Sequence, residues 1–274
     1  DAICVAEVPP VGVGEAATEG GHLLAVADGM GGYQRGEVAA KMAIDTLREM
    51  FAEDPGADPA LLLKQAFRRA NEKIYENGLG TGQDAMMGTT LVAVVTHGKY
   101  VTIASIGDSR AYLARANRLT QITKDHTIVA EQVARGSMTE QEARESPHRN
   151  VLTHALGHRP KVESKLPDIF EITLLPEDRL LLCSDGLYDV VPDDEMLRAL
   201  TEGAPEDAAQ RLVDLAVSRN ASDNVSAIVL AALPTREKPA VLETAGTGRT
   251  SFLLPAIAAV ILILILAAVF FFAL

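Results

Sequence analysis

Cysteine is scarce in this sequence. Its 274 residues include only Cys4 and Cys183, which lie far apart, each inside an apolar run typical of a strand. Neither a Cys-x-x-Cys pair nor a His-Glu-x-x-His pattern occurs, which argues against a zinc site and against a disulfide framework. Both cysteines are therefore predicted to be buried thiols in a reducing compartment.

Basic residues are few relative to acidic ones: 25 Lys and Arg stand against 37 Asp and Glu, a formal net charge of -12. A general nucleic-acid binder needs a basic face, so no nucleic-acid partner is expected. The acidic balance is compatible with a site that concentrates divalent cations. The chain starts at Asp1 without a basic-then-apolar leader, so no secretory signal is expected.

Charge is absent from residues 251–274, which consist mainly of Ile, Leu, Val, Ala and Phe. About 20 such residues span a bilayer as a helix, and a buried helix without any polar face is unusual. We predict a transmembrane helix over 252–274 after a linker over 234–251 that is rich in Pro, Gly, Thr and charge. Basic residues precede the span and none follows, which favours a single-pass protein of the inner (cytoplasmic) membrane with its N-terminal domain in the cytosol.

The first 233 residues alternate between strand-like and helical patterns. Helices are predicted over 36–53, from 58, over 193–202 and over 205–220, and strands over 2–8, 23–27, 89–95, 100–106, 110–113, 119–123, 170–174, 179–184 and 225–231. Consecutive hairpins indicate an antiparallel sheet and argue against a Rossmann-type fold. The prediction is an α+β domain over residues 1–233.

A polar, helical stretch interrupts the strands from about residue 125 to 161. Thr139 and Glu142 fit a capping box, with Thr139 as the N-cap. The stretch is typical of a small insertion or lid over the sheet. Its composition leaves open whether it is a structural excursion or faces a substrate.

Four aspartates stand at comparable places, where predicted strands end or begin: Asp28, Asp108, Asp185 and Asp223. Taken alone, Asp28-Gly29 is an ordinary turn dipeptide. If the strands share a sandwich, however, their ends meet at one rim, and the gathered carboxylates repel unless cations lie between them. Oxygen ligands without nearby Cys or His favour Mg²⁺ or Mn²⁺ over Zn²⁺. Two such ions can generate a hydroxide and clamp a phosphoryl group.

Five ordered motifs carry a resemblance to a known family: Ala27-Asp28-Gly29-Met30-Gly31-Gly32, Met87-Gly88-Thr89-Thr90, Ile106-Gly107-Asp108-Ser109-Arg110, Cys183-Ser184-Asp185-Gly186-Leu187 and Ser222-Asp223-Asn224-Val225-Ser226. Together they resemble the PP2C (PPM) family of metal-dependent serine/threonine protein phosphatases, in its bacterial form, over residues 1–232. The resemblance implies a PP2C-like sandwich of two antiparallel β-sheets flanked by pairs of helices. The predicted transmembrane helix would follow this domain.

The resemblance also assigns roles to individual residues. Asp28 would bridge two Mn²⁺ or Mg²⁺ ions, and the carbonyl of Gly29 would bind the second. Asp185 and Asp223 would complete the ligands of the first ion, and Asp108 with Asp185 resembles the pair that holds a third, weaker ion. The implied reaction is hydrolysis of phosphoserine and phosphothreonine by a metal-activated water, with Asp28, Asp185 and Asp223 acting through the metals.

Two further residues and one segment are placed by the same resemblance. Asp1 and Asn224 would support the site from outside the ligand set, and the polar stretch at about 127–160 matches the mobile flap of the family. Asp1 matches the Asp of a Glu-Asp pair in the first motif of the family. The Glu of that pair and a phosphate-binding Arg would lie upstream of Asp1, so either the chain is a fragment or the phosphate clamp is impaired.

The expected partners are proteins phosphorylated on Ser or Thr, namely eukaryote-like kinases or their substrates, and the membrane. The alternative is a non-catalytic, membrane-tethered module that binds phosphoproteins, which the missing Arg and Glu would motivate. His126, beside Asp125, is the best of the six histidines for a role facing the site, although a structural role is the stronger expectation.

Overall fold

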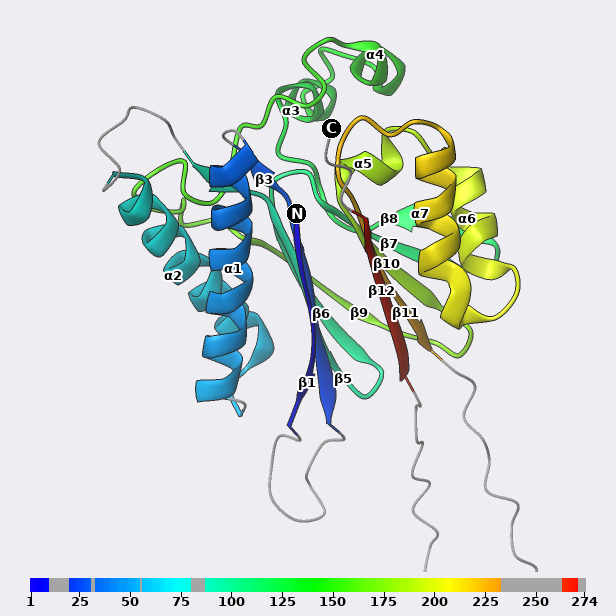
Figure 1. The fold of residues 1–274 in the computed structure, drawn as a ribbon, viewed down its shortest axis with the longest axis horizontal. Helices are drawn as coiled ribbons and strands as arrows, with labels where there is room; N and C mark the ends of the chain where they lie inside the picture. Colours follow the sequence, from blue (N-terminus) through cyan, green and yellow to red (C-terminus); the bar gives the residue numbers. More distant parts are fainter. Residues whose placement is uncertain (10–19, 31–32, 55, 80–86, 233–262, 271–274) are drawn as a thin grey trace, which may run out of the picture.

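The computed structural model describes residues 1–9, 20–30, 33–54, 56–79, 87–232 and 263–270. Two antiparallel sheets lie face to face in it (Figure 1). The first sheet has the order β1-β2-β5-β6-β9, with β1 (Ala2–Val8), β2 (Gly21–Ala27), β5 (Leu91–His97), β6 (Tyr100–Ile106) and β9 (Asp168–Thr173). The second has the order β12-β11-β10-β7-β8, with β7 (Arg110–Arg115), β8 (Arg118–Gln121), β10 (Arg179–Cys183), β11 (Val225–Ala232) and β12 (Ile263–Phe270).

Helices cover the outer face of each sheet. The first sheet carries α1 (Tyr33–Glu53) and α2 (Pro59–Leu79), and the second carries α6 (Asp193–Thr201) and α7 (Ala208–Ser218), with the 3-10 helix η2 (Pro205–Asp207) before α7. The helix predicted from residue 58 is confirmed, and its apolar stripe of Leu63, Phe67, Ala70 and Ile74 is buried. The predicted α+β sandwich with flanking helix pairs is therefore confirmed.

Alternation along β2 shows how one strand serves two layers of the core. Leu23, Ala25 and Ala27 pack in the cluster beneath the helices. Leu24 and Val26 point the other way, into the cluster between the two sheets. Successive side chains of a strand face opposite sides of the sheet, and both sides are covered here. Residues 23–27 are all apolar for that reason. Asp28 follows at the end of the strand.

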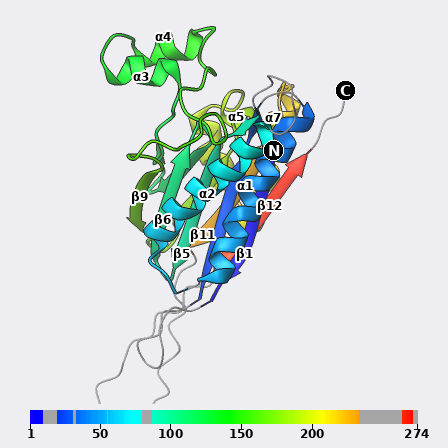
Figure 2. The same cartoon turned by 90° about the vertical axis from the view of Figure 1, so that its left-hand side faces the viewer.

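The polar stretch forms a separate lobe above one end of the sandwich (Figure 2). It contains α3 (Ile128–Ala134) and α4 (Glu140–Glu145). The predicted capping box is confirmed: the backbone N–H of Glu142 donates to Thr139 Oγ1 at 3.2 Å, and the N–H of Thr139 donates to Glu142 Oε2 at 2.8 Å. We refer to residues 127–160 as the flap.

The transmembrane helix predicted over 252–274 is not found in the described part of the chain. Residues 263–270 form β12 instead, which pairs antiparallel with β11 from Val225↔Phe270 to Ala232↔Ile263. Residues 234–262 and 271–274, including the predicted linker, lie outside the described residues. In the described ranges no helix is long and apolar enough to cross a membrane. A continuous apolar run has no periodicity that separates strand from helix, and the edge of β11 offers unpaired backbone groups to such a strand.

Candidate metal centre

Asp28 follows β2 and is held through its backbone by two threonines. Its N–H donates to Thr90 Oγ1 at 3.0 Å, and its carbonyl accepts from the Thr90 N–H and from Thr89 Oγ1, each at 2.8 Å. These contacts occupy both polar groups of the Asp28 backbone and leave the carboxylate free for the site. The Gly88-Thr89-Thr90 motif therefore fixes the position of Asp28.

Gly29 lies in a small ladder that the sequence did not predict, in which β3 (Gly29–Met30) pairs with β4 (Gly88–Thr89). A Cβ on Gly29 would collide with the backbone of Gly36 in the first turns of α1, and a Cβ on Gly36 would collide with the carbonyl of Gly29. The close approach of α1 to the Asp28 turn thus requires glycine at both positions. The Gly29 carbonyl as a metal ligand stays a prediction.

Asp108 lies in the turn between β6 and β7 and is only 5% exposed. Gly107 before it has φ of +102°, and a Cβ there would collide with the side chain of Thr90. Ser109 after it shares a hydrogen bond of 2.7 Å with Thr90 Oγ1. Thr90 therefore links the turn of Asp108 to the turn of Asp28, although the two are far apart in sequence.

Asp185 begins the four-residue helix α5 (Asp185–Tyr188), directly after β10. Gly186 packs against the carbonyl of Asn224, where a Cβ would collide, so the Asp185 turn lies close to the Asp223-Asn224 turn before β11. The exposed Asp223 accepts the N–H of Asn224 on Oδ1 at 2.7 Å. The structure thus brings Asp28, Asp108, Asp185 and Asp223 to the same rim of the sandwich. Figure 1 shows the flap helices α3 and α4 above the end of the sandwich where α5 lies.

The electrostatics of this rim show that the carboxylates influence one another. Burial raises the pKa of Asp28, and the charges of Asp223 and Asp108 raise it further. Burial also raises the pKa of Asp185, with added repulsion from Asp28 and Asp223. The pKa of Asp108 is raised to about 7 by burial and by the charge of Asp185. Oδ1 of Asp185 is buried with no hydrogen-bond donor beside it among the described residues.

These observations fit a hard divalent cation. Buried like-charged carboxylates with an unpartnered oxygen need positive charge nearby, and oxygen donors are those that Mg²⁺ and Mn²⁺ prefer. As the side chains lie, no group of three or more His, Cys, Asp or Glu in the described ranges is close enough together to hold an ion ready-made. The chemistry of the donor set therefore supports a metal centre, whereas the exact ligand geometry stays a prediction.

Asp1 lies beside the Asp223-Asn224 turn. Its carboxylate Oδ2 accepts from Ser226 Oγ at 2.8 Å, and its α-amino group donates to Asn224 Oδ1 at 3.5 Å. Both residues that were predicted to support the site from outside the ligand set are therefore neighbours of one another and of Asp223. Their effect on the metals remains a prediction.

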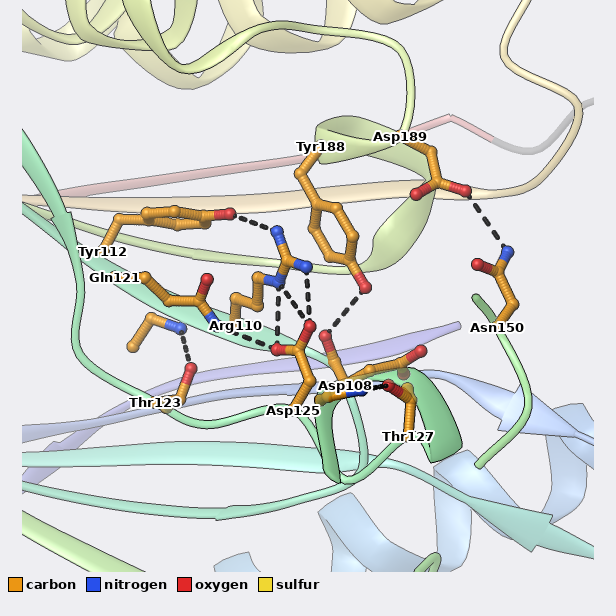
Figure 3. A network of polar contacts seen from close by, with 12 residues as sticks. Asp108, Arg110, Tyr112, Gln121, Thr123, Asp125, Thr127, Asn150, Tyr188 and Asp189 are labelled. Carbon is orange, nitrogen blue, oxygen red and sulfur yellow. Dashed lines mark hydrogen bonds and ion pairs between the residues drawn. The ribbon is translucent and has the colours of Figure 1, made fainter. Parts of the chain in front are cut away.

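Sequence reasoning missed a stack of side chains behind Asp108 (Figure 3). Arg110 donates to Asp125 from Nε at 3.0 and 3.2 Å and from Nη2 at 2.6 Å. Its Nη1 donates to the hydroxyl of Tyr112 at 2.7 Å, and its guanidinium carbon lies 3.4 Å from the ring centroid of Tyr188. Arg110 lay in one of the five motifs and Asp125 was noted only as the neighbour of His126, both without a role, and no local pattern pointed to Tyr188.

His126 supports the Asp108 turn from the other side. Its Nδ1 accepts the N–H of Gly107 at 3.1 Å, and its own backbone N–H donates to the Gly107 carbonyl at 2.9 Å. Because Nδ1 accepts, the proton of the neutral ring is on Nε2, which faces Asp168 at 3.4 Å. Burial lowers the pKa of His126. This geometry agrees with the structural role that the sequence favoured.

The flap is tied to the same region. Arg149 Nη2 and Asn150 Nδ2 each lie 3.2 Å from Asp189 Oδ2, directly after α5. At the base of the flap, an isolated bridge joins Thr127 and Leu152. The flap therefore contacts the segment that carries Asp185, and a ligand at the rim would lie beneath it.

Comparisons with known proteins agree with this geometry. A family model described as protein phosphatase 2C matches residues 14–224. The chain is 41% identical over 211 residues to the serine/threonine protein phosphatase PstP of Mycobacterium tuberculosis, covering 77% of this chain and 40% of PstP. It is 34% identical over 213 residues to the serine/threonine phosphatase stp of Listeria welshimeri, covering 76% of this chain and 83% of that protein.

Among solved structures, the catalytic domain of PstP in complex with two manganese ions is similar, with a TM-score of 0.66 and 36% identity. The match covers 83% of this chain and 96% of that one. The chain spans less than half the length of the PstP protein itself. The family model covers well over half of the chain, with the Asp28, Asp108, Asp185 and Asp223 turns inside its bounds. This chain belongs to the protein phosphatase 2C family.

Proposed function

We propose that this chain hydrolyses phosphoserine and phosphothreonine in proteins as a metal-dependent phosphatase. The observation that carries the proposal is the rim where burial and neighbouring aspartate charges raise the pKa values of Asp28, Asp108 and Asp185, while Oδ1 of Asp185 has no donor among the described residues. The similar proteins are named serine/threonine phosphatases, which supports the same substrate class here.

The residues that would hold the cations are Asp28, Asp185 and Asp223 together with the carbonyl of Gly29, and Asp108 with Asp185 for a weaker third ion. When bound, two divalent cations supply an activated water as the nucleophile and positive charge for the phosphoryl oxygens. Manganese in the similar PstP structure favours Mn²⁺ or Mg²⁺ here. An acidic chain repels a phosphate dianion, so the cations also make the rim attractive to the substrate.

The residues of the chain itself supply positioning. Thr89 and Thr90 fix the backbone of Asp28, so that only its side chain has to adjust when the cations bind. Exposed Asp223 lies at the outer side of the rim, where a phosphorylated loop could enter beneath the flap. The substrates would be proteins phosphorylated by eukaryote-like kinases, or those kinases themselves.

The alternative reading, a tethered phosphoprotein-binding module without catalysis, has less support. All four aspartates are present at one rim, and the matched relatives are named as phosphatases. A binding module would not need buried carboxylates that repel one another, since a phosphate is held by basic groups and backbone N–H groups.

The proposal is tested by hydrolysis of phosphoserine and phosphothreonine peptides with and without Mn²⁺. Wild-type protein should release phosphate only with the cation, and Asp28→Asn should abolish release. Asp194→Asn is the matched control, because Asp194 is an exposed aspartate on α6 whose carboxylate pairs with Arg198, and it should retain full activity. Wild-type protein that binds phosphopeptides but releases no phosphate would support the binding module instead.

We also propose that residues 252–274 attach the protein to the cytoplasmic membrane, with the phosphatase domain in the cytosol. In the attached state Ile263–Phe270 would leave the edge of β11, with which they pair in the structure. The lack of charge after residue 250 and the preceding Arg236, Lys238 and Arg249 support this location. Membrane fractions from a bacterial host should contain the chain, whereas a version that ends at residue 233 should be in the soluble fraction. Recovery of both versions from the soluble fraction would contradict the proposed attachment.

A further inference from the structure

Tyr188 connects two of the four aspartates. It is the last residue of α5, the four-residue helix that begins with Asp185. Its hydroxyl donates a hydrogen bond of 3.0 Å to the backbone carbonyl of Asp108 (Figure 3). Asp108 and Asp185 come from different strand ends, so this contact joins the turn of one carboxylate to the helix of the other.

The Tyr188 side chain is itself held in place. The guanidinium of Arg110 lies over its ring at 3.4 Å, and Asp125 holds that guanidinium through Nε and Nη2. A cation over an aromatic face is attracted by the ring electrons. The stack therefore presents one O–H in a fixed direction.

The Asp108 turn needs such support. Gly107 before it has a positive φ. Glycine adopts this conformation without strain, but it also adopts negative φ as readily, so other contacts have to select the conformation of the turn. His126 holds the Gly107 peptide through both its N–H and its carbonyl. Tyr188 holds the following carbonyl, that of Asp108. The two contacts fix the turn on both sides of the residue whose carboxylate faces Asp185.

We propose that Tyr188 is a positioning residue that braces Asp108 against Asp185 and so sets the affinity of the third, weakest cation. This inference rests on the proposed function, because it requires cations at the rim. The two tighter ions are assigned to Asp28, Asp185 and Asp223, none of which contacts the Tyr188 hydroxyl, so their affinity does not depend on it.

The test is calorimetric titration of the metal-free chain with MnCl₂. Tyr188→Phe keeps the ring beneath Arg110 and removes only the hydroxyl. It should weaken the weakest binding event by about two- to tenfold, the equivalent of one hydrogen bond, and leave the tighter events unchanged. Tyr112→Phe is the matched control. It removes the hydroxyl that accepts a hydrogen bond from Arg110 Nη1, and this hydroxyl does not contact Asp108. It should leave all binding events unchanged.

Steady-state kinetics supply a second readout. For Tyr188→Phe, the Mn²⁺ concentration that gives half-maximal activity should rise by the same factor, and kcat at saturating Mn²⁺ should match wild type. In an Asp108→Asn background, Tyr188→Phe should have no further effect on either quantity, because its target carboxylate is gone. A general loss of packing would instead lower activity equally in both backgrounds, which would overturn the inference.

The outcomes separate the two proposals. If wild type binds Mn²⁺ and hydrolyses phosphopeptides while Tyr188→Phe binds every ion as wild type does, only the positioning role fails. If wild type binds no Mn²⁺ at the rim, the proposed function itself fails. If Tyr188→Phe and Tyr112→Phe weaken the weakest event equally, the effect comes from the Arg110 stack in general and the Asp108 brace is wrong.

Discussion

The two ends of β10 carry aspartates in opposite situations. Asp178, just before the strand, is 2% exposed and accepts from Arg115 Nε at 2.9 and 3.1 Å, from Arg115 Nη2 at 2.5 Å and from the N–H of Leu175 at 2.6 Å. Asp185, just after the strand, has a buried Oδ1 for which the described residues supply no donor. We call the Asp178 side the closed end and the Asp185 side the open end.

The contrast between Asp178 and Asp185 gives a criterion for proposing a metal ligand at a strand end. Asp178 is buried and Asp185 is half-buried, but the larger difference is the source of compensating charge. At the closed end the chain supplies an arginine, so nothing from outside is needed. At the open end Arg110 lies nearby, but its guanidinium is bonded to Asp125. The neighbours of Asp185 are carboxylates, and the proposed cations would supply the missing positive charge.

The largest expected effect comes from neutralising the open end. Asp185→Asn should lower phosphatase activity by about a hundredfold or more, because a carboxylate ligand of the first ion is lost. The same change removes like-charge repulsion and should not destabilise the metal-free fold. Phosphopeptide hydrolysis and thermal unfolding, both measured on the same preparation, check the two halves of this expectation. An Asp185→Asn protein that unfolds more easily but keeps its activity would contradict the assignment of Asp185 to the metal centre.

Addition of Mn²⁺ should stabilise the protein through the open end alone. At a free concentration 100 times the dissociation constant, one bound ion adds about 2.7 kcal/mol to the free energy of unfolding. Melting curves should therefore shift upward with Mn²⁺ for wild type and for Asp178→Asn, and much less for Asp185→Asn. Equal shifts in all three proteins would place the ion elsewhere.

Neutralising the closed end should lower the stability of the fold and leave the phosphatase activity unchanged. Asp178→Asn should lower the free energy of unfolding by about 2 kcal/mol, a value below that of a fully buried pair because the Arg115 side chain is 38% exposed. Activity per folded molecule with Mn²⁺ should be unchanged. Urea unfolding and peptide hydrolysis measure these quantities, and a loss of kcat in the folded variant would contradict the division into two ends.

A smaller effect concerns pH in the metal-free protein. Asp108 has a pKa of about 7 in the folded state against an ordinary value of 3.8, so the folded state holds the proton more tightly. Its contribution to stability is fully present below the ordinary value and is lost as pH rises through about 7. Unfolding of the chelated protein should become easier from pH 5 to pH 8, and Asp108→Asn should flatten that dependence. A wild-type stability that rises over this range would contradict it.

Much of the fold followed from the sequence because the signals are local. Hairpin turns, the stripe on α2 and the capping box at Thr139 are read within a few residues. The face-to-face arrangement of two sheets came from the family resemblance and not from these patterns. Residues 263–270 show the limit, because an uninterrupted apolar run predicts burial without choosing between helix and strand.

The candidate site divides in the same way. The four aspartates could be found because each lies where a predicted apolar strand ends or begins. Tyr188 and the Arg110–Asp125 pair could not be given roles, because the contact of Tyr188 with Asp108 spans 80 residues and depends on how α5 packs. Asp178 illustrates the reverse risk: it also borders a strand, and only its contact with Arg115 shows that it is structural.

The central claim is that the open end binds divalent cations through Asp28, Asp185 and Asp223. A crystal of the chain soaked in MnCl₂, with anomalous diffraction recorded for manganese, tests it most directly. We expect two strong anomalous peaks within coordination distance of these three carboxylates and a weaker peak between Asp108 and Asp185. Density for manganese only at other sites, with Oδ1 of Asp185 still without a partner, would contradict the claim.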